Sequence, residues 1–116
     1  MMALEKRREP RVQAAYQITF ECFRAGAKIS EGVAHTVNLS EHGALIEMPC
    51  AIGVDSTLIL WISAPFYTLL LQGDVVHAHP EANGVFRIGV HLTDVIEGNW
   101  DHLKRDVLMR LEDELE

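Results

Sequence analysis

The sequence predicts a mainly β domain, an antiparallel barrel or sandwich with one helix packed against it at the C-terminal end. Apolar and polar residues alternate along about six short segments, which is typical of half-buried strands. The period changes to that of a helix only after residue 99. The chain has 116 residues, of which 48% are hydrophobic and 23% charged, so it is long enough for one core and too apolar for a disordered chain.

The expected strands are separated by turn residues. In the first, over residues 12–22, the apolar members are Val12, Ala14, Tyr16, Ile18, Phe20 and Cys22, and Ala25-Gly26 ends it. Further strands are expected at 33–37, 44–48, 57–62, 66–77 and 85–92, with turns at 38–43, 49–55, 63–65 and 80–84. Gly73 predicts a bulge or a bend in the strand over 66–77.

A helix is expected from about residue 100, with Asn99 as its N-cap. One face of this helix is apolar and consists of Trp100, Leu103, Val107, Leu108, Leu111 and Leu115. The chain ends in a cluster of acidic residues, which oppose the helix dipole. We therefore expect this end to fray or to meet a partner.

Charge and cysteine content exclude several classes of protein. The net charge is −7, which argues against binding DNA or RNA. Residues 5–11 nevertheless carry a net charge of +2 on an otherwise acidic chain, and such a patch suits a small anion. The two cysteines do not form a disulfide scaffold, and Cys22 is expected to be a buried thiol. Since neither a signal peptide nor an apolar run of about 18–20 residues is found, a cytoplasmic protein without membrane insertion is expected.

No catalytic motif is recognisable, so the chain is expected not to be an enzyme and to carry no metal or cofactor. The six histidines are scattered along the chain. His77 and His79 share one strand face, where two solvent-facing histidines are expected rather than a metal site. Ser40 and His42 lie close together, but no orienting carboxylate accompanies them.

Two short motifs carry the functional prediction. The first is Arg7-Arg8-Glu9-Pro10-Arg11, in which Pro10 favours an extended backbone. A guanidinium can form two hydrogen bonds to the O6/N7 edge of guanine, and it can also bind a phosphate or stack on a base. Taken alone, this motif is far more typical of a solvated basic arm.

The second motif is the stretch 38–43, an Asn-x-Ser-x-x-Gly. Asn38 and Ser40 are expected to point to the same side where the chain leaves its strand, so both could address one edge of a ligand. Gly43 permits a positive φ or a close approach of a ligand to the backbone. Taken alone, the stretch is also typical of a polar connection between strands.

Together the motifs resemble the PilZ family of bacterial cyclic di-GMP receptors, which has an N-terminal Arg-x-x-x-Arg and a later Asp/Asn-x-Ser-x-x-Gly. Arg7 and Arg11 match the first, and Asn38, Ser40 and Gly43 match the second. The segment 86–92 also looks like the last barrel strand of the family. The resemblance implies a six-stranded antiparallel β-barrel over 12–116 with a C-terminal helix, preceded by a flexible basic arm over 1–11.

The resemblance also implies the roles of single residues. Arg7 and Arg11 are expected to hold guanine edges and phosphates of cyclic di-GMP, and Arg8 is a further phosphate candidate. Asn38 and Ser40 are expected to hydrogen-bond a guanine, and Gly43 to keep the rim of the barrel low. Asn38 replaces the commoner Asp and lacks its charge, so a somewhat lower affinity is expected. Arg87, which is expected to face outward, is a further candidate contact.

The function implied is that of a receptor without catalytic activity, in which the ligand orders the arm and a downstream protein partner or a homodimer carries the signal. The alternative is a PilZ-fold adaptor that contacts other proteins and binds no nucleotide. A flavin-binding barrel enzyme is a third reading. The partner, the pathway and the number of ligands bound stay open at this point.

Overall fold

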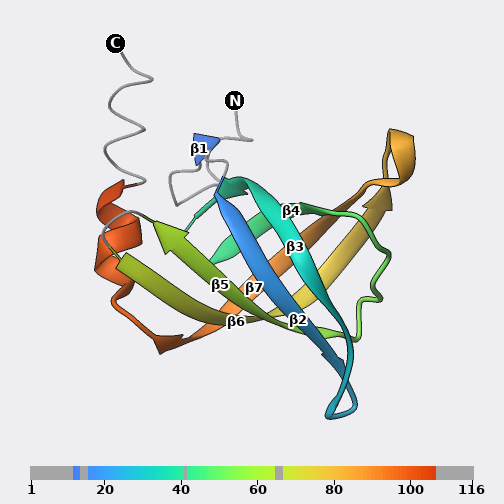
Figure 1. The fold of residues 1–116 in the computed structure, drawn as a ribbon, viewed down its shortest axis with the longest axis horizontal. Coiled ribbons are helices and arrows are strands. Elements are labelled where there is room, and N and C mark those ends of the chain that lie inside the picture. The colour runs from blue at the N-terminus through green and yellow to red at the C-terminus, as the bar shows by residue number, and fades with distance from the viewer. Residues whose placement is uncertain (1–11, 14–15, 41, 65–66, 107–116) are drawn as a thin grey trace, which may run out of the picture.

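The computed structural model describes residues 12–13, 16–40, 42–64 and 67–106, which are mostly strand (Figure 1). The strands are β1 (Val12–Gln13), β2 (Gln17–Arg24), β3 (Ala27–Leu39), β4 (Gly43–Met48), β5 (Thr57–Ala64), β6 (Tyr67–Pro80) and β7 (Phe86–Glu97). A short 3-10 helix, η2 (Ala82–Gly84), joins β6 to β7, and residues 100–106 are helical.

Six of the strands close into an antiparallel barrel. They follow one another in the order β3-β2-β5-β6-β7-β4, and β4 pairs with β3 to complete the circle. Strand β1 lies outside this ring and pairs with the last two residues of β3. The prediction of a six-stranded antiparallel barrel followed by a helix is confirmed.

The barrel is filled by the alternating apolar residues that predicted its strands. The interior positions of β2 are Ile18, Phe20 and Cys22, which are at most 2% exposed. On β7, Ile88, Val90 and Leu92 are buried in the same way. The predicted buried thiol at Cys22 is confirmed, because its side chain is fully buried and the residue is not in a disulfide.

Local chemistry explains where strands turn and bend. The β2–β3 hairpin turns at Ala25-Gly26, where both residues have a positive φ. In β6 the register with β7 shifts between Gln72 and Gly73, so the bulge predicted at Gly73 is confirmed. A Cβ atom at Gly73 would lie 2.6 Å from Val90 Cγ1 and 2.7 Å from the carbonyl oxygen of His91, so the two strands approach too closely there for any side chain.

The strand expected at 33–37 is considerably longer in the structure. Strand β3 begins at Ala27, and residues 27–29 and 31 are exposed. Because this part of the strand buries little, it lacks the alternation by which the rest was found. The strand expected over 12–22 is described as β1 and β2, and the latter continues to Arg24.

The helix packs against the barrel next to the start of β2. Its N-terminus is capped as predicted, because the Oδ1 atom of Asn99 accepts a hydrogen bond of 2.8 Å from the backbone N–H of Asp101. Leu103 is fully buried against the core. The carboxylate of Asp106 accepts hydrogen bonds from the hydroxyls of Tyr16 and Tyr67. Within the described part of the chain, no helix is long and apolar enough to cross a membrane.

Candidate functional site

Asn38, Ser40 and Gly43 lie where β3 ends and β4 begins, so the motif forms the connection between two neighbouring strands. Asn38 is half-buried and still belongs to β3, where it pairs with Gln13 of β1 on one side and with Leu45 of β4 on the other. Gly43 is the first residue of β4. The backbone at both ends of the motif is therefore held by sheet pairing.

Ser40 shapes the loop between these strands. Its side chain is only 3% exposed, and its hydroxyl lies 3.3 Å from the carbonyl oxygen of Gly43. The backbone N–H of Ser40 donates to the same carbonyl oxygen at 2.9 Å. The carbonyl oxygen of His42 accepts from the N–H of Leu92 at 2.9 Å, which ties the loop to β7. Gly43 is not among the described glycines with a positive φ, which are Gly26, Gly84 and Gly98.

The outer surface of the sheet beside the motif is formed by β4 and β7. Since Ala44 and Ile46 point into the barrel, Gly43 and Leu45 face outward on β4. Their partners on β7 are His91 and Gly89. A Cβ atom at Gly89 would collide with the ring of His77, so that ring lies directly over the glycine. Both glycines are buried in the structure, and the His77 ring fills the space over Gly89 that a side chain would take.

The alternation of side chains along the strands is sufficient to place Leu45, Gly89 and His91 on this outer face. None of the three belongs to either sequence motif, so the motifs did not predict them as site residues. His77 and His79 are exposed as expected, and their ring centroids are 5.2 Å apart. Among the described residues, no three His, Cys, Asp or Glu side chains are grouped so that they could hold a metal ion.

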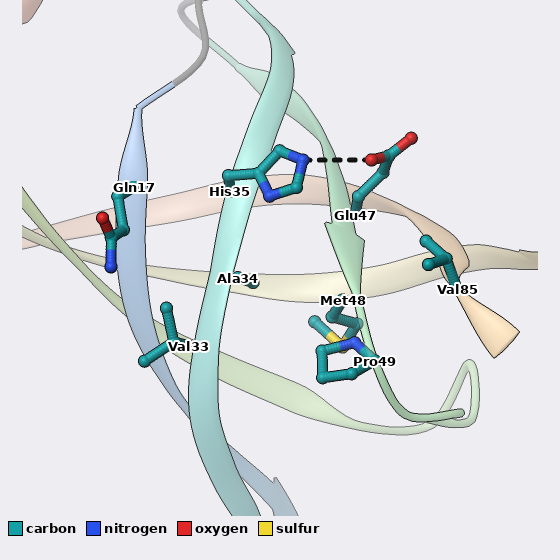
Figure 2. A pocket seen from close by; sticks show the side chains of 8 residues that line it. All are labelled: Gln17, Val33, Ala34, His35, Glu47, Met48, Pro49 and Val85. Atoms are coloured by element: carbon teal, nitrogen blue, oxygen red, sulfur yellow. Dashed lines mark hydrogen bonds and ion pairs between the residues drawn. The ribbon is translucent and has the colours of Figure 1, made fainter. Parts of the chain in front are cut away.

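Arg87 faces outward, as predicted, but it lies in a different ionic cluster. Its Nε donates to Glu47 Oε2 at 3.0 Å, and the other carboxylate oxygen of Glu47 lies 3.0 Å from the His35 ring (Figure 2). The hydrogen bond from Arg87 and, to a lesser degree, that from His35 lower the pKa of the Glu47 carboxyl. Glu47 and Arg87 are paired, four residues along the strands from the Gly43–His91 pair, which is about 13 Å.

Arg7, Arg8 and Arg11 lie outside the described residues. The structure does, however, place the chain that follows them. Val12 pairs with Leu39 and Gln13 pairs with Asn38, so β1 runs along the end of β3 beside the motif. The residue after Arg11 is thus a direct sheet neighbour of the residue before Ser40. The chain that directly follows Arg11 therefore lies beside Asn38, which is 27 positions later in the sequence than Arg11.

Comparison with known proteins assigns this arrangement to a family. Residues 5–108 match the PilZ domain, and the chain therefore belongs to the PilZ family. No curated protein sequence matches the chain.

Two solved structures have the same fold. The Bacillus subtilis inhibitor of motility, MotI/DgrA, aligns with a TM-score of 0.73 and 13% identity over 92% of this chain. K. pneumonia MrkH, solved as a complex with c-di-GMP, aligns with a TM-score of 0.60 and 13% identity over 94% of this chain. The chain spans 52% of the length of each, about half of either protein.

Proposed function

We propose that this PilZ domain is a cyclic di-GMP receptor whose site joins Arg7, Arg8 and Arg11 to Asn38, Ser40 and Gly43. The observation that carries the proposal is the pairing of β1 with the end of β3, because it brings the chain next to Arg11 to the edge that holds Asn38. Membership of the PilZ family and the likeness to the MrkH–c-di-GMP complex support the same ligand.

The chemistry of the two halves is complementary. The ligand has two phosphates and two guanines, and the arginines of the arm supply the charge and the paired N–H donors that these groups accept. Asn38 offers both a donor and an acceptor to the edge of a guanine. Ser40 keeps the loop closed on Gly43, which fixes the connection between β3, the strand that carries Asn38, and β4.

The energies are sufficient for a signalling ligand. A hydrogen bond to a charged group contributes about 1.5–3 kcal/mol. A micromolar dissociation constant requires about −8 kcal/mol. Two or three arginines that each form two such bonds supply about 6–18 kcal/mol, which is of the size needed for this affinity and for the cost of association. The arm should therefore dominate the affinity, and its arginines should not be replaceable by single contacts on the barrel.

The signal is proposed to pass through the arm. When the ligand binds, residues 5–12 become ordered on the barrel edge and, together with the ligand, form a new surface for a downstream protein or a second copy. The chain acts in the cytoplasm, binds neither DNA nor RNA and catalyses no reaction in this proposal.

Isothermal titration calorimetry with cyclic di-GMP tests the site. The intact protein should bind, Arg7→Ala or Arg11→Ala alone should weaken binding at least tenfold, and the double variant should show no heat. Arg105→Ala, on the exposed face of the helix, is the matched control and should bind normally. Hydrogen exchange at residues 5–12 should slow when the ligand is added. A folded protein without any binding heat would instead indicate a PilZ-fold adaptor that contacts only proteins.

A further inference from the structure

The barrel is not closed evenly along its β3–β4 seam. Strand β3 has 13 residues, but it pairs with β4 only between His35 and Leu39. Over residues 27–34 it pairs with β2 alone. Strand β4 ends at Met48 and is followed by Pro49, which has no N–H to donate. Along residues 27–34 one main-chain edge of β3 therefore has no strand beside it in the described part of the chain.

A groove of about 420 Å³ lies at the upper end of this edge (Figure 2). It is lined by Val33, Ala34 and His35 of β3 with neighbouring Gln17, and by Glu47, Met48, Pro49 and Val85 on the other side. Continuing the register of β4, in which Glu47 pairs with His35, would bring residue 49 beside Val33. The groove thus occupies the strand position that β4 leaves, and its lining is largely apolar.

The outward side chains along this edge are two aliphatic residues with an acidic residue between them. Ile29 and Val33 are 50% and 51% exposed, so both can contact a segment that binds at this edge. Glu31 lies between them and faces outward as well. Natural proteins usually protect such an edge with proline, with charge or with a covering segment, because unpaired N–H and C=O groups recruit other strands.

The surface beside this edge carries an excess of negative charge when Glu21 of the neighbouring strand β2 is included. Glu31 pairs across the strands with Glu21, and the two carboxylates share a single cation, Lys28, at 2.7 and 3.3 Å. One carboxylate is therefore left without a full countercharge. A second copy of this chain would bring the same excess to the interface, whereas a segment with a basic residue would neutralise it.

We propose that the β3 edge is a docking site for an extended segment of a partner protein, which adds as a strand beside residues 27–34. The segment has an apolar–x–basic–x–apolar pattern. Its main chain pairs with β3, its apolar residues pack beside Ile29 and Val33, and its lysine or arginine faces Glu31. This mode of recognition takes affinity from main-chain hydrogen bonds and specificity from alternate side chains. The proposal does not depend on nucleotide binding.

Two nine-residue peptides test this site in titrations with the full chain. One has the sequence Thr-Ser-Val-Thr-Arg-Thr-Val-Ser-Thr, and the other has Glu in place of Arg. The Arg peptide should bind about two- to fivefold more tightly, as expected for one exposed ion pair. Glu31→Lys should invert this preference, and Glu97→Lys, an exposed charge at the end of β7, should not. Val33→Thr keeps a β-branched residue and should weaken both peptides.

Hydrogen exchange locates the bound peptide. Amides within residues 28–34 should exchange more slowly when the Arg peptide is present, also in the Arg7→Ala/Arg11→Ala variant. Equal binding of both peptides, or unchanged exchange in this segment, would overturn the proposal. Analytical ultracentrifugation of the chain without peptide measures its oligomeric state. A dimer that dissociates in the Glu31→Lys or Val33→Thr variant would show that the edge binds a second copy and that the proposal is wrong.

Discussion

Asn38 is the residue of the proposed site whose backbone pairs with a strand on each side. Its backbone is held between Gln13 and Leu45, so the position of its side chain depends on strand pairing and not on the loop. Ser40 differs in this respect, because its buried hydroxyl and its N–H both lie against the carbonyl oxygen of Gly43. A change at Ser40 therefore alters the loop, whereas the backbone at Asn38 is held by its two neighbouring strands.

We therefore predict that Asn38→Asp raises the affinity for cyclic di-GMP about fivefold. Hydrogen bonds to a charged group contribute about 1 kcal/mol more than neutral ones, and 1.4 kcal/mol corresponds to a factor of ten. Calorimetry on both proteins measures the difference. Asn83→Asp, in the exposed turn before β7, is the control and should leave the affinity unchanged. A lower affinity for Asn38→Asp would mean that this side chain donates to the ligand instead of accepting from it.

Among the secondary-structure elements, the bulged strand β6 depends on Gly73. A methyl group there would meet Val90 Cγ1 at 2.6 Å and the backbone oxygen of His91 at 2.7 Å, and the oxygen belongs to a paired strand that cannot move alone. We predict that Gly73→Ala lowers the free energy of unfolding by about 1–3 kcal/mol, as overpacking usually does. At Gly53, a methyl group would meet only the side chains of Arg24 and Asp55, so Gly53→Ala should cost much less. Urea denaturation of both variants compares the two, and equal costs would contradict this account.

The same elements show what local pattern can and cannot predict. Strands with one buried face, such as β2 and β7, were found from alternation, and the Asn99 cap and the Gly73 bulge followed from the chemistry of single residues. The exposed part of β3 was missed because few of its side chains are buried, so no apolar period marks it. Its free edge depends on where β4 ends relative to β3, which is a property of pairing between distant segments.

For the proposed site, the motif placed Asn38 and Gly43 at the junction of two strands, as the structure has them. The burial of Ser40 was not predictable, because it depends on how the loop closes on Gly43 and on β7. The outward row of Leu45, Gly89 and His91 comes from strands that are far apart in the sequence, and only the barrel order makes them neighbours. The alignment of β1 with β3 likewise appears only in the pairing.

On the scale of the whole molecule, Tyr16 connects the parts that the proposed function uses. It follows β1, and its backbone exchanges hydrogen bonds with Thr36, whose side chain accepts from the N–H of Tyr16 at 2.8 Å. Its hydroxyl donates to Asp106 of the helix. The start of the barrel, the strand that carries Asn38 and the C-terminal helix therefore meet at one residue, and the helix is docked by a polar contact beside the apolar one at Leu103.

This contact should appear in the pH dependence of stability. Burial and, next, the hydrogen bond to Asp106 raise the pKa of the Tyr16 hydroxyl well above its usual value. In the unfolded chain a tyrosine titrates near pH 10. The folded state thus holds its proton where the unfolded state loses it, and the stabilisation is full below about pH 10 and declines as the pH rises further.

We predict that Tyr16→Phe lowers the free energy of unfolding by about 1–3 kcal/mol at pH 7, because the partly buried carboxylate of Asp106 loses a donor. The variant should also lose stability less steeply than the parent protein between about pH 10 and 11.5, since phenylalanine does not titrate. Denaturation at several pH values measures both effects, and hydrogen exchange at Leu103 should quicken if the helix is released. Thr68→Ala, an exposed strand position near the same end of the barrel, should change neither the slope nor the exchange. The stability of the Tyr16→Phe variant and that of the parent could instead fall equally steeply above about pH 10. This result would show that folding does not raise the pKa of Tyr16 and that the helix is held by apolar packing alone.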